Sequence, residues 1–340
     1  MLSSQFRPTN VNVIRNNIEF FIRGFILEYD FRSGKDRSFP PIVHIETTNV
    51  CNLKCIHCPQ SDPYNLIPGY SPQYIEWDLW TKIVDEIASN NGTLRLTPDG
   101  EPMLVSAWTK MVDYALSKNI KTFCFNTHGV FMEGDKMDVL LQDTETQIAI
   151  EFSIDGLWKS SYDKIRVGSD YEKLLTNIFS LKKEIRLRKR NNVKILVSCV
   201  QQPELEDQEF EHFEKFWTPL VDKVITRRYV DTKGIMPHKP EVDQHREHRW
   251  PCLVLFTRLV VTYDGNVRFC PDDWMKTSTI GNVNDNSLQE IWNGKVLSDI
   301  REKHLEGKFE DSHIACAGCT DWKVIEWGND YTAALDNLFS

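Results

Sequence analysis

Nine cysteines occur in this chain of 340 residues, and seven of them fall into two groups whose spacing suits metal binding. The first group, Cys51, Cys55 and Cys58, has the spacing C-x3-C-x2-C. Three thiolates on one short loop can hold three irons of a [4Fe–4S] cluster and leave the fourth iron open for a substrate. Structural zinc prefers four protein ligands, and no fourth is evident on this loop. An open iron–sulfur site is therefore favoured over zinc and over unrelated core cysteines.

Four further cysteines form the second group: Cys252, Cys270, Cys316 and Cys319. Two apolar runs lie between the first pair, and Asp264-Gly265 separates them, as is typical of a hairpin turn. We expect this hairpin to bring the first pair together and the C-x-x-C pair to complete a closed site. By spacing alone, four thiolates suit structural zinc nearly as well as an iron–sulfur cluster.

The elements that must position the first group are predicted between residues 42 and 231. Six short apolar runs have strand character: Ile42–Thr47, Thr93–Thr97, Thr122–Asn126, Gln147–Ser153, Val193–Gln201 and Lys223–Arg227. Helical patterns lie between them near 74–89, 107–118, 134–142, 171–187 and 208–217. This alternation predicts an α/β fold with right-handed βαβ units and a parallel sheet. Six units make a partial (β/α)6 barrel, because a complete eight-unit barrel needs more chain.

The chain is predicted to divide into four parts: a lead-in at 1–41, the barrel at 42–231, a polar linker at 232–250 and a small metal-binding appendage at 251–340. In the lead-in, apolar spacing over Asn10–Leu27 predicts one amphipathic helix packed on the barrel. The appendage is predicted to hold the hairpin, a helix at 287–303 and the second cysteine group.

Composition and charge restrict the class of protein. The formal net charge of −9 argues against binding nucleic acid through a general positive field. No apolar run approaches the roughly 18 residues of a membrane span, and the N-terminus shows no secretory signal. We therefore expect a cytoplasmic protein with reduced cysteines, no membrane partner and no nucleic-acid partner.

Polar side chains collect at the carboxyl ends of the predicted strands, where parallel sheets place their chemistry. Glu46 ends the first strand and is expected to meet substrate or cofactor. Arg227 ends the sixth strand, and its guanidinium suits an anionic group of a substrate. Residues 272–274, Asp-Asp-Trp, follow Cys270 and are a further candidate for a substrate contact.

Several motifs, in order along the chain, resemble those of the radical S-adenosylmethionine (SAM) superfamily. The cysteine motif is its signature, and His57 occupies the usual aromatic position. The other matches are Gly100-Glu101-Pro102, similar to G-G-E-P with Asp99 replacing the first glycine; Thr127-His128-Gly129, similar to T-N-G; Ser153-Ile154-Asp155-Gly156, similar to S-x-D-G; and Arg166.

This resemblance implies a cofactor and a chemistry. The open iron would bind SAM, and a 5′-deoxyadenosyl radical would abstract a hydrogen atom from substrate. An external reductase, such as flavodoxin or ferredoxin, would supply the electron. The residues implied in binding SAM are His57, Gly100, Glu101, Pro102, Asn126, Ser153, Asp155 and Arg166.

The last part of the chain resembles the SPASM/twitch extension of the same superfamily, so the resemblance covers about residues 42–325. It implies that Cys252, Cys270, Cys316 and Cys319 hold an auxiliary [4Fe–4S] cluster. No cysteine follows Cys319, which points to one auxiliary cluster and hence to two clusters in all. The pattern is most similar to that of the dehydrogenases that oxidise the aminocyclitol 2-deoxy-scyllo-inosamine.

A fully ligated auxiliary cluster is simplest to use as an electron acceptor. The leading hypothesis is therefore a two-electron oxidation of a hydroxyl-bearing carbon in a polar small molecule such as a sugar or aminocyclitol. The alternative is redox-neutral chemistry by an epimerase, dehydratase or decarboxylase. An epimerase needs a hydrogen donor, for which Cys199 is the better candidate and Cys124 the other. Modification of a ribosomal peptide and a non-enzymatic zinc-stabilised binding protein are the remaining hypotheses.

Overall fold

A curved parallel sheet forms the body of the protein. The computed structural model describes residues 18–22, 25–29, 31, 37–206, 208–240, 249–323 and 331–340. Six adjacent parallel strands make the body: β3 (Ile42–Ile45), β4 (Thr93–Leu96), β5 (Thr122–Thr127), β6 (Gln147–Ser153), β7 (Val193–Gln201) and β8 (Lys223–Arg228). The prediction of a partial barrel of six units is thereby confirmed.

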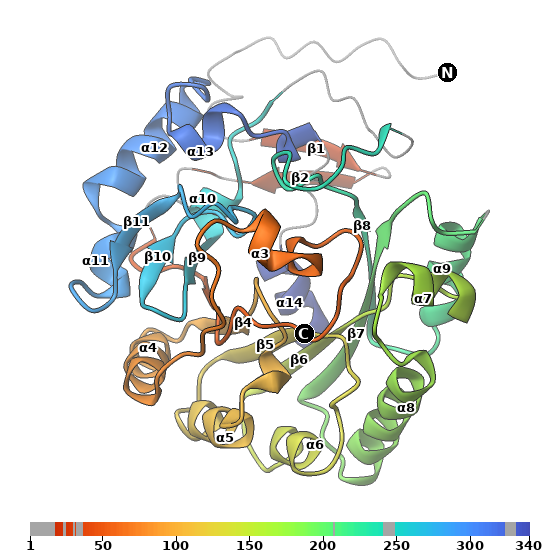
Figure 1. Ribbon diagram of the computed structural model, residues 1–340. Helices are drawn as coiled ribbons and strands as arrows, with labels where there is room; N and C mark the ends of the chain where they lie inside the picture. Colours follow the sequence, from red (N-terminus) through yellow and green to blue (C-terminus); the bar gives the residue numbers. More distant parts are fainter. Residues whose placement is uncertain are drawn as a thin grey trace.

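Helices cover the convex face of this sheet (Figure 1). They are α4 (Trp77–Ser89), α5 (Trp108–Ser117), α6 (Asp135–Leu140), α7 (Lys159–Ile165), α8 (Tyr171–Leu187) and α9 (Glu209–Trp217). Each long helix buries one stripe; in α4 the buried residues are Trp80, Ile83, Val84 and Ile87, at the three- and four-residue spacing of one helical face. Within the described residues, no helix is both long and apolar enough to cross a membrane.

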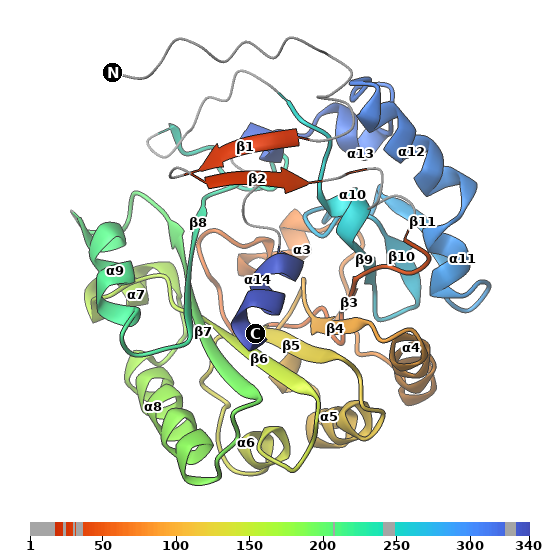
Figure 2. The ribbon, with the colours of Figure 1, turned by 180° about the vertical axis from the view of Figure 1, so that it is seen from behind.

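The concave face encloses a lumen that is closed at one end. Side chains alternate between the two faces of each strand, so Phe123 and Phe125 pack on the helices while Cys124 and Asn126 face inward. At the closed end, Leu335 of α14 (Tyr331–Phe339) packs in one apolar cluster with inward side chains of four strands: Ile42, Cys124, Ala149 and Leu196. Figure 2 shows α14 on the side of the sheet away from α3 (Pro63–Leu66), which lies in the loop after β3.

The C-terminal appendage continues the sheet of the barrel. Strand β9 (Arg258–Val261) pairs in parallel with β3, and β10 (Asn266–Arg268) and β11 (Thr279–Asn282) follow antiparallel, giving nine strands in one sheet. Between residues 251 and 323 the appendage also contains α10 (Val254–Thr257), α11 (Leu288–Trp292), α12 (Lys295–Leu305) and α13 (Ile314–Ala317). The single helix predicted at 287–303 is wrong in one respect, because it breaks at Asn293-Gly294, where Gly294 has an extended backbone.

The N-terminal prediction is wrong for the part of the lead-in that the structure describes. Strands β1 (Ile18–Ile22) and β2 (Phe25–Tyr29) form an antiparallel hairpin in which Ile22 pairs with Phe25, in place of the amphipathic helix. Both segments are rich in isoleucine and phenylalanine, which favour strands as strongly as their spacing favours a helix. Residues 10–17 of the predicted helix lie outside the described residues.

A buried ionic cluster joins the appendage to the barrel. Arg268 of β10 is 1% exposed; its guanidinium lies 3.2 Å from the carboxylate of Asp99 and 3.8 Å from that of Glu46, and it donates to the carbonyl of Asp273 at 2.7 Å. Two carboxyl groups therefore share one cation. Burial, and then the charge of Asp99, raises the pKa of Glu46 to about 8.

This cluster predicts a pH dependence of stability. Because the folded-state pKa of Glu46 lies above the ordinary value of 4.5, its contribution is fully present below about pH 4.5 and is lost as pH rises towards 8. We expect the melting temperature to fall between about pH 5 and pH 8, and to fall less in Glu46→Gln, which keeps a neutral side chain. The measurement is thermal unfolding across this range.

The control is Glu145→Gln at an exposed position, which should keep the pH dependence of the unsubstituted protein. Equal slopes in all three proteins would exclude Glu46 as the source.

Candidate functional site

A cavity of about 300 Å³ opens at the carboxyl ends of the barrel strands. Cys51, Cys55 and Cys58 line it on one side, and Trp274 of the appendage lines it as well. Six of the residues predicted to bind SAM also line it: His57, Gly100, Glu101, Asn126, Ser153 and Arg166. The structure therefore brings together side chains that are spread over more than a hundred residues of sequence.

The three cysteines of the first group suit a metal cluster in their chemistry. Burial raises the pKa of the Cys51 thiol to about 12 and raises the pKa of Cys55 and Cys58 as well, with nearby thiols adding to the effect at Cys51 and Cys58. Buried thiolates this close together need a compensating positive charge, which iron supplies. The loop is held in place by backbone hydrogen bonds, in which the N–H of Lys54 and that of Ile56 donate to the carbonyls of Val167 and Ile165.

The loop after β4 approaches the cysteine loop very closely. Gly100 has a φ of +71°, and a Cβ built there would lie 2.3 Å from the carbonyl oxygen of Thr48 and 2.8 Å from that of Val50. The N–H of Glu101 donates to the carbonyl of Val50 at 2.8 Å. Only glycine permits both this conformation and this distance.

The Glu101 carboxylate ties three segments together. It accepts hydrogen bonds from the N–H of Met103 (3.1 Å), the hydroxyl of Thr127 (2.9 Å) and the N–H of His128 (2.9 Å). The imidazole of His128 in turn bonds to Asn52 on the cysteine loop at 2.9 Å. Pro102, also predicted to bind SAM, begins a buried 3₁₀ turn (Pro102–Leu104) and does not line the cavity.

A second charged group supports the cysteine loop from the other side. Asp155 accepts hydrogen bonds from the guanidinium of Arg166 (2.8 Å) and from the N–H of Val200 (2.8 Å), and His57 lies 3.5 Å from the same carboxylate. Burial alone would raise the pKa of Asp155, but Arg166 and His57 outweigh it and lower the pKa. Arg166 also lies 3.8 Å from the sulfur of Cys55, so its positive charge faces the thiols.

Deeper in the lumen, a third group of polar residues includes two that the sequence analysis did not single out, His44 and Arg95. Arg95 donates to Asn126 (2.6 Å) and to Glu151 (3.2 Å), and Arg227 lies 2.6 Å from the other oxygen of Glu151. Burial would raise the pKa of Glu151, but Arg227 and Arg95 lower it to about 2. The sequence feature that could have identified His44 and Arg95 is a polar residue inside each of two apolar strands, Ile-Val-His-Ile and Thr-Leu-Arg-Leu.

Two residues predicted to be catalytic lie elsewhere. Cys199 faces the helices, in the core cluster that contains Ile195, Val197 and Phe213. The odd-numbered residues of β7 face the helices, whereas even-numbered ones such as Leu196 face the lumen. Cys199 does not line the cavity, so its prediction as hydrogen donor is wrong. Glu46 lies in the joint with Arg268 and does not line the cavity either.

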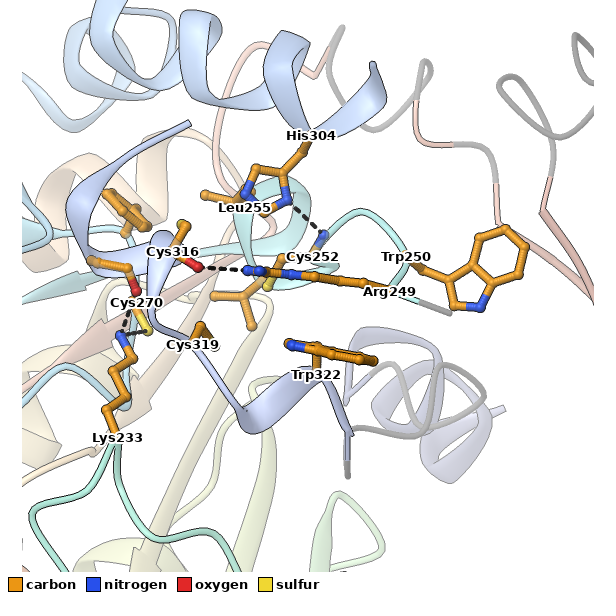
Figure 3. Close-up of a pocket in the computed structure, with 13 residues that line it drawn as sticks. Lys233, Arg249, Trp250, Cys252, Leu255, Cys270, His304, Cys316, Cys319 and Trp322 are labelled. Atoms are coloured by element: carbon orange, nitrogen blue, oxygen red, sulfur yellow. Dashed lines mark hydrogen bonds between the residues drawn. The ribbon is translucent and has the colours of Figure 1, made fainter. Parts of the chain in front are cut away.

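The second cysteine group lines a separate, smaller cavity of about 40 Å³ (Figure 3). Cys252, Cys270, Cys316 and Cys319 all contribute to its wall, as the spacing predicted. Burial raises the pKa of each thiol; for Cys252 the value is about 12. The donor set therefore suits a metal cluster held by four thiolates.

The segment predicted as a linker contributes to this second site. Lys233 lies with its Nζ 3.6 Å from the sulfur of Cys270 and donates to the carbonyl of Ala315 at 3.1 Å. Arg249 donates to the carbonyl of Cys316 at 2.7 Å. Figure 3 shows Lys233 and Arg249 approaching the four cysteines from different sides.

Two family models match separate parts of the chain. A model of the radical SAM superfamily matches residues 45–216. A model described as an iron–sulfur cluster-binding domain, SPASM, matches residues 252–320. The first match contains the first cysteine group, and the second contains all four cysteines of the second group.

Two curated proteins share part of the sequence. GTP 3′,8-cyclase of Mannheimia succiniciproducens is 28% identical over 196 residues, which are 56% of this chain and 52% of that protein. An uncharacterized protein of Treponema pallidum is 26% identical over 116 residues, 34% of this chain and 31% of the relative. The chain thus spans about half the length, or less, of these relatives.

Several solved structures share the fold. BtrN in complex with AdoMet and 2-DOIA has a TM-score of 0.55 at 17% identity, covering 82% of this chain and 92% of BtrN. Streptococcus suis SuiB bound to precursor peptide SuiA has a TM-score of 0.62 at 15% identity, covering 90% of this chain and 75% of SuiB. At these identities the likeness is one of fold.

The contact at Gly100 yields a prediction about cluster binding. In Gly100→Ala the added methyl group cannot fit against the carbonyls of Thr48 and Val50, so the start of the cysteine loop must move. We expect anaerobically reconstituted Gly100→Ala to bind roughly half the iron of the unsubstituted protein, since only the first site is disturbed. Iron analysis measures this.

Gly69→Ala is the matched control, because Gly69 has a similar φ of +66° but no atom of the described residues lies within 4 Å of its built Cβ. Full iron content in Gly100→Ala would show that the loop does not depend on this contact.

Proposed function

Because this chain belongs to the radical SAM superfamily, we propose that it oxidises a hydroxyl-bearing carbon of a polar small molecule to a carbonyl. It is a radical SAM enzyme with an iron–sulfur cluster-binding domain, as the motifs indicated. Its cofactors are SAM, a [4Fe–4S] cluster in the radical SAM domain and additional iron–sulfur cluster content in the SPASM domain.

The two cysteine groups would bind the two clusters at separate places in the structure. Cys51, Cys55 and Cys58 would hold the cluster that binds SAM, and Cys252, Cys270, Cys316 and Cys319 would hold one auxiliary cluster. When bound, these groups supply a radical that removes one hydrogen atom from substrate and an acceptor for the electron that leaves as the hydroxyl loses its proton. The substrate would thereby lose two protons and two electrons in all, one of each as the abstracted hydrogen atom.

The main support for an oxidation reaction is the positive charge beside the second cysteine site. Lys233 lies 3.6 Å from the sulfur of Cys270, and its Nζ also bonds to the backbone of α13. A cation at this distance favours the more reduced, more negative state of a cluster and so supports a role as electron acceptor. Asp273 and Asp321 lie near the same lysine and act against it, so the charge at position 233 has to be tested directly.

The residues of the barrel support a small polar substrate. His44, Arg95, Asn126, Ser153 and Arg227 line the cavity, and each offers a hydrogen-bonding group. Below them, Leu335 and its apolar neighbours close the lumen and would keep water from a radical. The solved neighbours include one complex with 2-DOIA and one with a peptide, so likeness of fold does not choose between these classes.

The electron that starts the reaction must come from outside the chain. Radical SAM enzymes need a reductant, and we propose a small protein of the flavodoxin or ferredoxin type. The function itself is tested by incubating the reconstituted enzyme with SAM, reductant and a panel of sugars and aminocyclitols. One 5′-deoxyadenosine per product, with loss of two hydrogens, is the expected result. A rearranged product of unchanged oxidation state would favour the redox-neutral alternative.

The assignment of two clusters predicts the iron content. Anaerobically reconstituted protein should bind about eight irons, and the triple variant Cys51→Ala, Cys55→Ala, Cys58→Ala about four, because each cluster contains four. Iron and zinc analysis of both proteins measures this.

About four irons in the unsubstituted protein and none in the triple variant, with one zinc retained in both, would make the second site structural and remove the electron acceptor.

Removing the charge of Lys233 is expected to change the reduction potential of the auxiliary cluster. In Lys233→Gln the nearby charge is lost, so we expect the midpoint potential of the auxiliary cluster to fall by an amount on the order of tens of millivolts. Lys233→Arg should retain most of the original value. A redox titration followed by electron paramagnetic resonance measures both.

Lys239→Gln is the control within the same segment, since Lys239 pairs with Glu204 and contacts no cysteine of the site. An unchanged potential in Lys233→Gln would remove the main support for the oxidation.

A further inference from the structure

The inner part of the barrel cavity carries an excess of positive charge. Arg95 and Arg227 both line the cavity, and both pair with the single carboxylate of Glu151, which is 0% exposed. Among Arg95, Arg227 and Glu151 the cations outnumber the carboxylate by one. Asp272 of the appendage also lies near Arg227, and burial raises the pKa of this carboxyl group, which favours its neutral form. The low pKa of Glu151, about 2, means that this balance holds throughout the working pH range.

His44 adds a buried, unsatisfied polar atom to the same place. Its side chain lines the cavity while the residue is only 4% exposed, and its Nδ1 bonds to the hydroxyl of Thr97 at 2.8 Å. Its Nε2 has no hydrogen-bond partner among the residues that the structure describes. A buried polar atom without a partner is costly, and one on the wall of a cavity is the position at which a ligand would supply the missing bond.

The charges that surround His44 agree with this. Burial, followed by Arg95, Arg258 and Arg268, lowers the pKa of His44 well below its usual value, so the ring is neutral. Arg268 is compensated by Asp99 and Glu46. The field at His44 is therefore positive, and the group that relieves it is an anion.

The position along the strands places this group away from the cysteine loop. His44 and Arg95 are paired residues inside β3 and β4, whereas the cysteine loop follows the carboxyl end of β3. Beneath them lies the apolar layer of Ile42 and Leu335. An anion bound here would occupy the closed end of the cavity and leave the rest of a substrate extending towards the cysteines.

We propose that His44, Arg95 and Arg227 form a subsite for an anionic group of the substrate, a carboxylate or a phosphate. Arg227, whose side chain is 36% exposed, would supply a guanidinium fork, and His44 would bond through Nε2. The subsite anchors one end of the substrate and so determines which carbon faces the cysteine loop. This inference rests on the proposed function for the identity of the cavity as the substrate site.

The test measures the binding of two small anions, inorganic phosphate and acetate, to the reconstituted holoenzyme loaded with SAM. Isothermal titration calorimetry at low ionic strength is carried out on the unsubstituted protein and on Arg227→Gln. We expect at least one anion to bind, and to bind about tenfold more weakly, or worse, to Arg227→Gln, the loss of one charge-assisted contact. Which of the two binds more tightly distinguishes a phosphate from a carboxylate.

Arg228→Gln is the matched control. Arg228 is the next residue of β8, pairs in register with Gln201 and does not line the cavity, so its loss should leave anion binding unchanged. Iron content and uncoupled cleavage of SAM, measured on each variant, show that the fold and the first site are intact.

Equal binding to the unsubstituted protein and Arg227→Gln, no binding to either, or equal weakening in Arg228→Gln would overturn the proposal. The result is separable from the proposed function: a redox-neutral product leaves the anion subsite in place, and loss of the subsite leaves the oxidation in place.

Discussion

The arrangement at the mouth of the barrel depends on how closely the loop after β4 approaches the loop after β3. Gly100 allows this approach because it has no Cβ, and the N–H of Glu101 then reaches the carbonyl of Val50. From that position the Glu101 carboxylate binds Thr127 and His128 at the end of β5. One steric constraint thus fixes the cysteine loop, the loop after β4 and the end of β5 against one another.

Two buried charge clusters in the same sheet have opposite compositions and opposite consequences. Glu151 is one carboxylate between two guanidinium groups, and its pKa falls to about 2. Glu46 and Asp99 are two carboxyls beside one guanidinium, Arg268, and the pKa of Glu46 rises to about 8. The first cluster lines the cavity and suits an anion; the second joins the two parts of the chain and makes that joint sensitive to pH.

The joint also places the appendage against the barrel cavity. The appendage extends the barrel sheet through β9, and Trp274 of the appendage lines the barrel cavity. The segment that leads into the appendage contributes Lys233 and Arg249 to the cysteine cavity. The segment that connects the two parts therefore also supplies positive side chains around the proposed electron acceptor.

The sequence by itself determined the two groups of metal-binding cysteines and the order of the elements, and the resemblance of its motifs to a known family implied the cofactor. Cysteine spacing and strand–helix alternation are local patterns, so both cysteine groups and all six barrel strands were predictable. Only the tertiary structure decided which side chains meet. Cys199 lies on the helix face because pairing with the neighbouring strands sets its register, which one strand alone does not reveal. Likewise Glu46 and Asp99 meet Arg268, and Arg95 and Arg227 both meet Glu151, across distances in sequence that no local pattern spans.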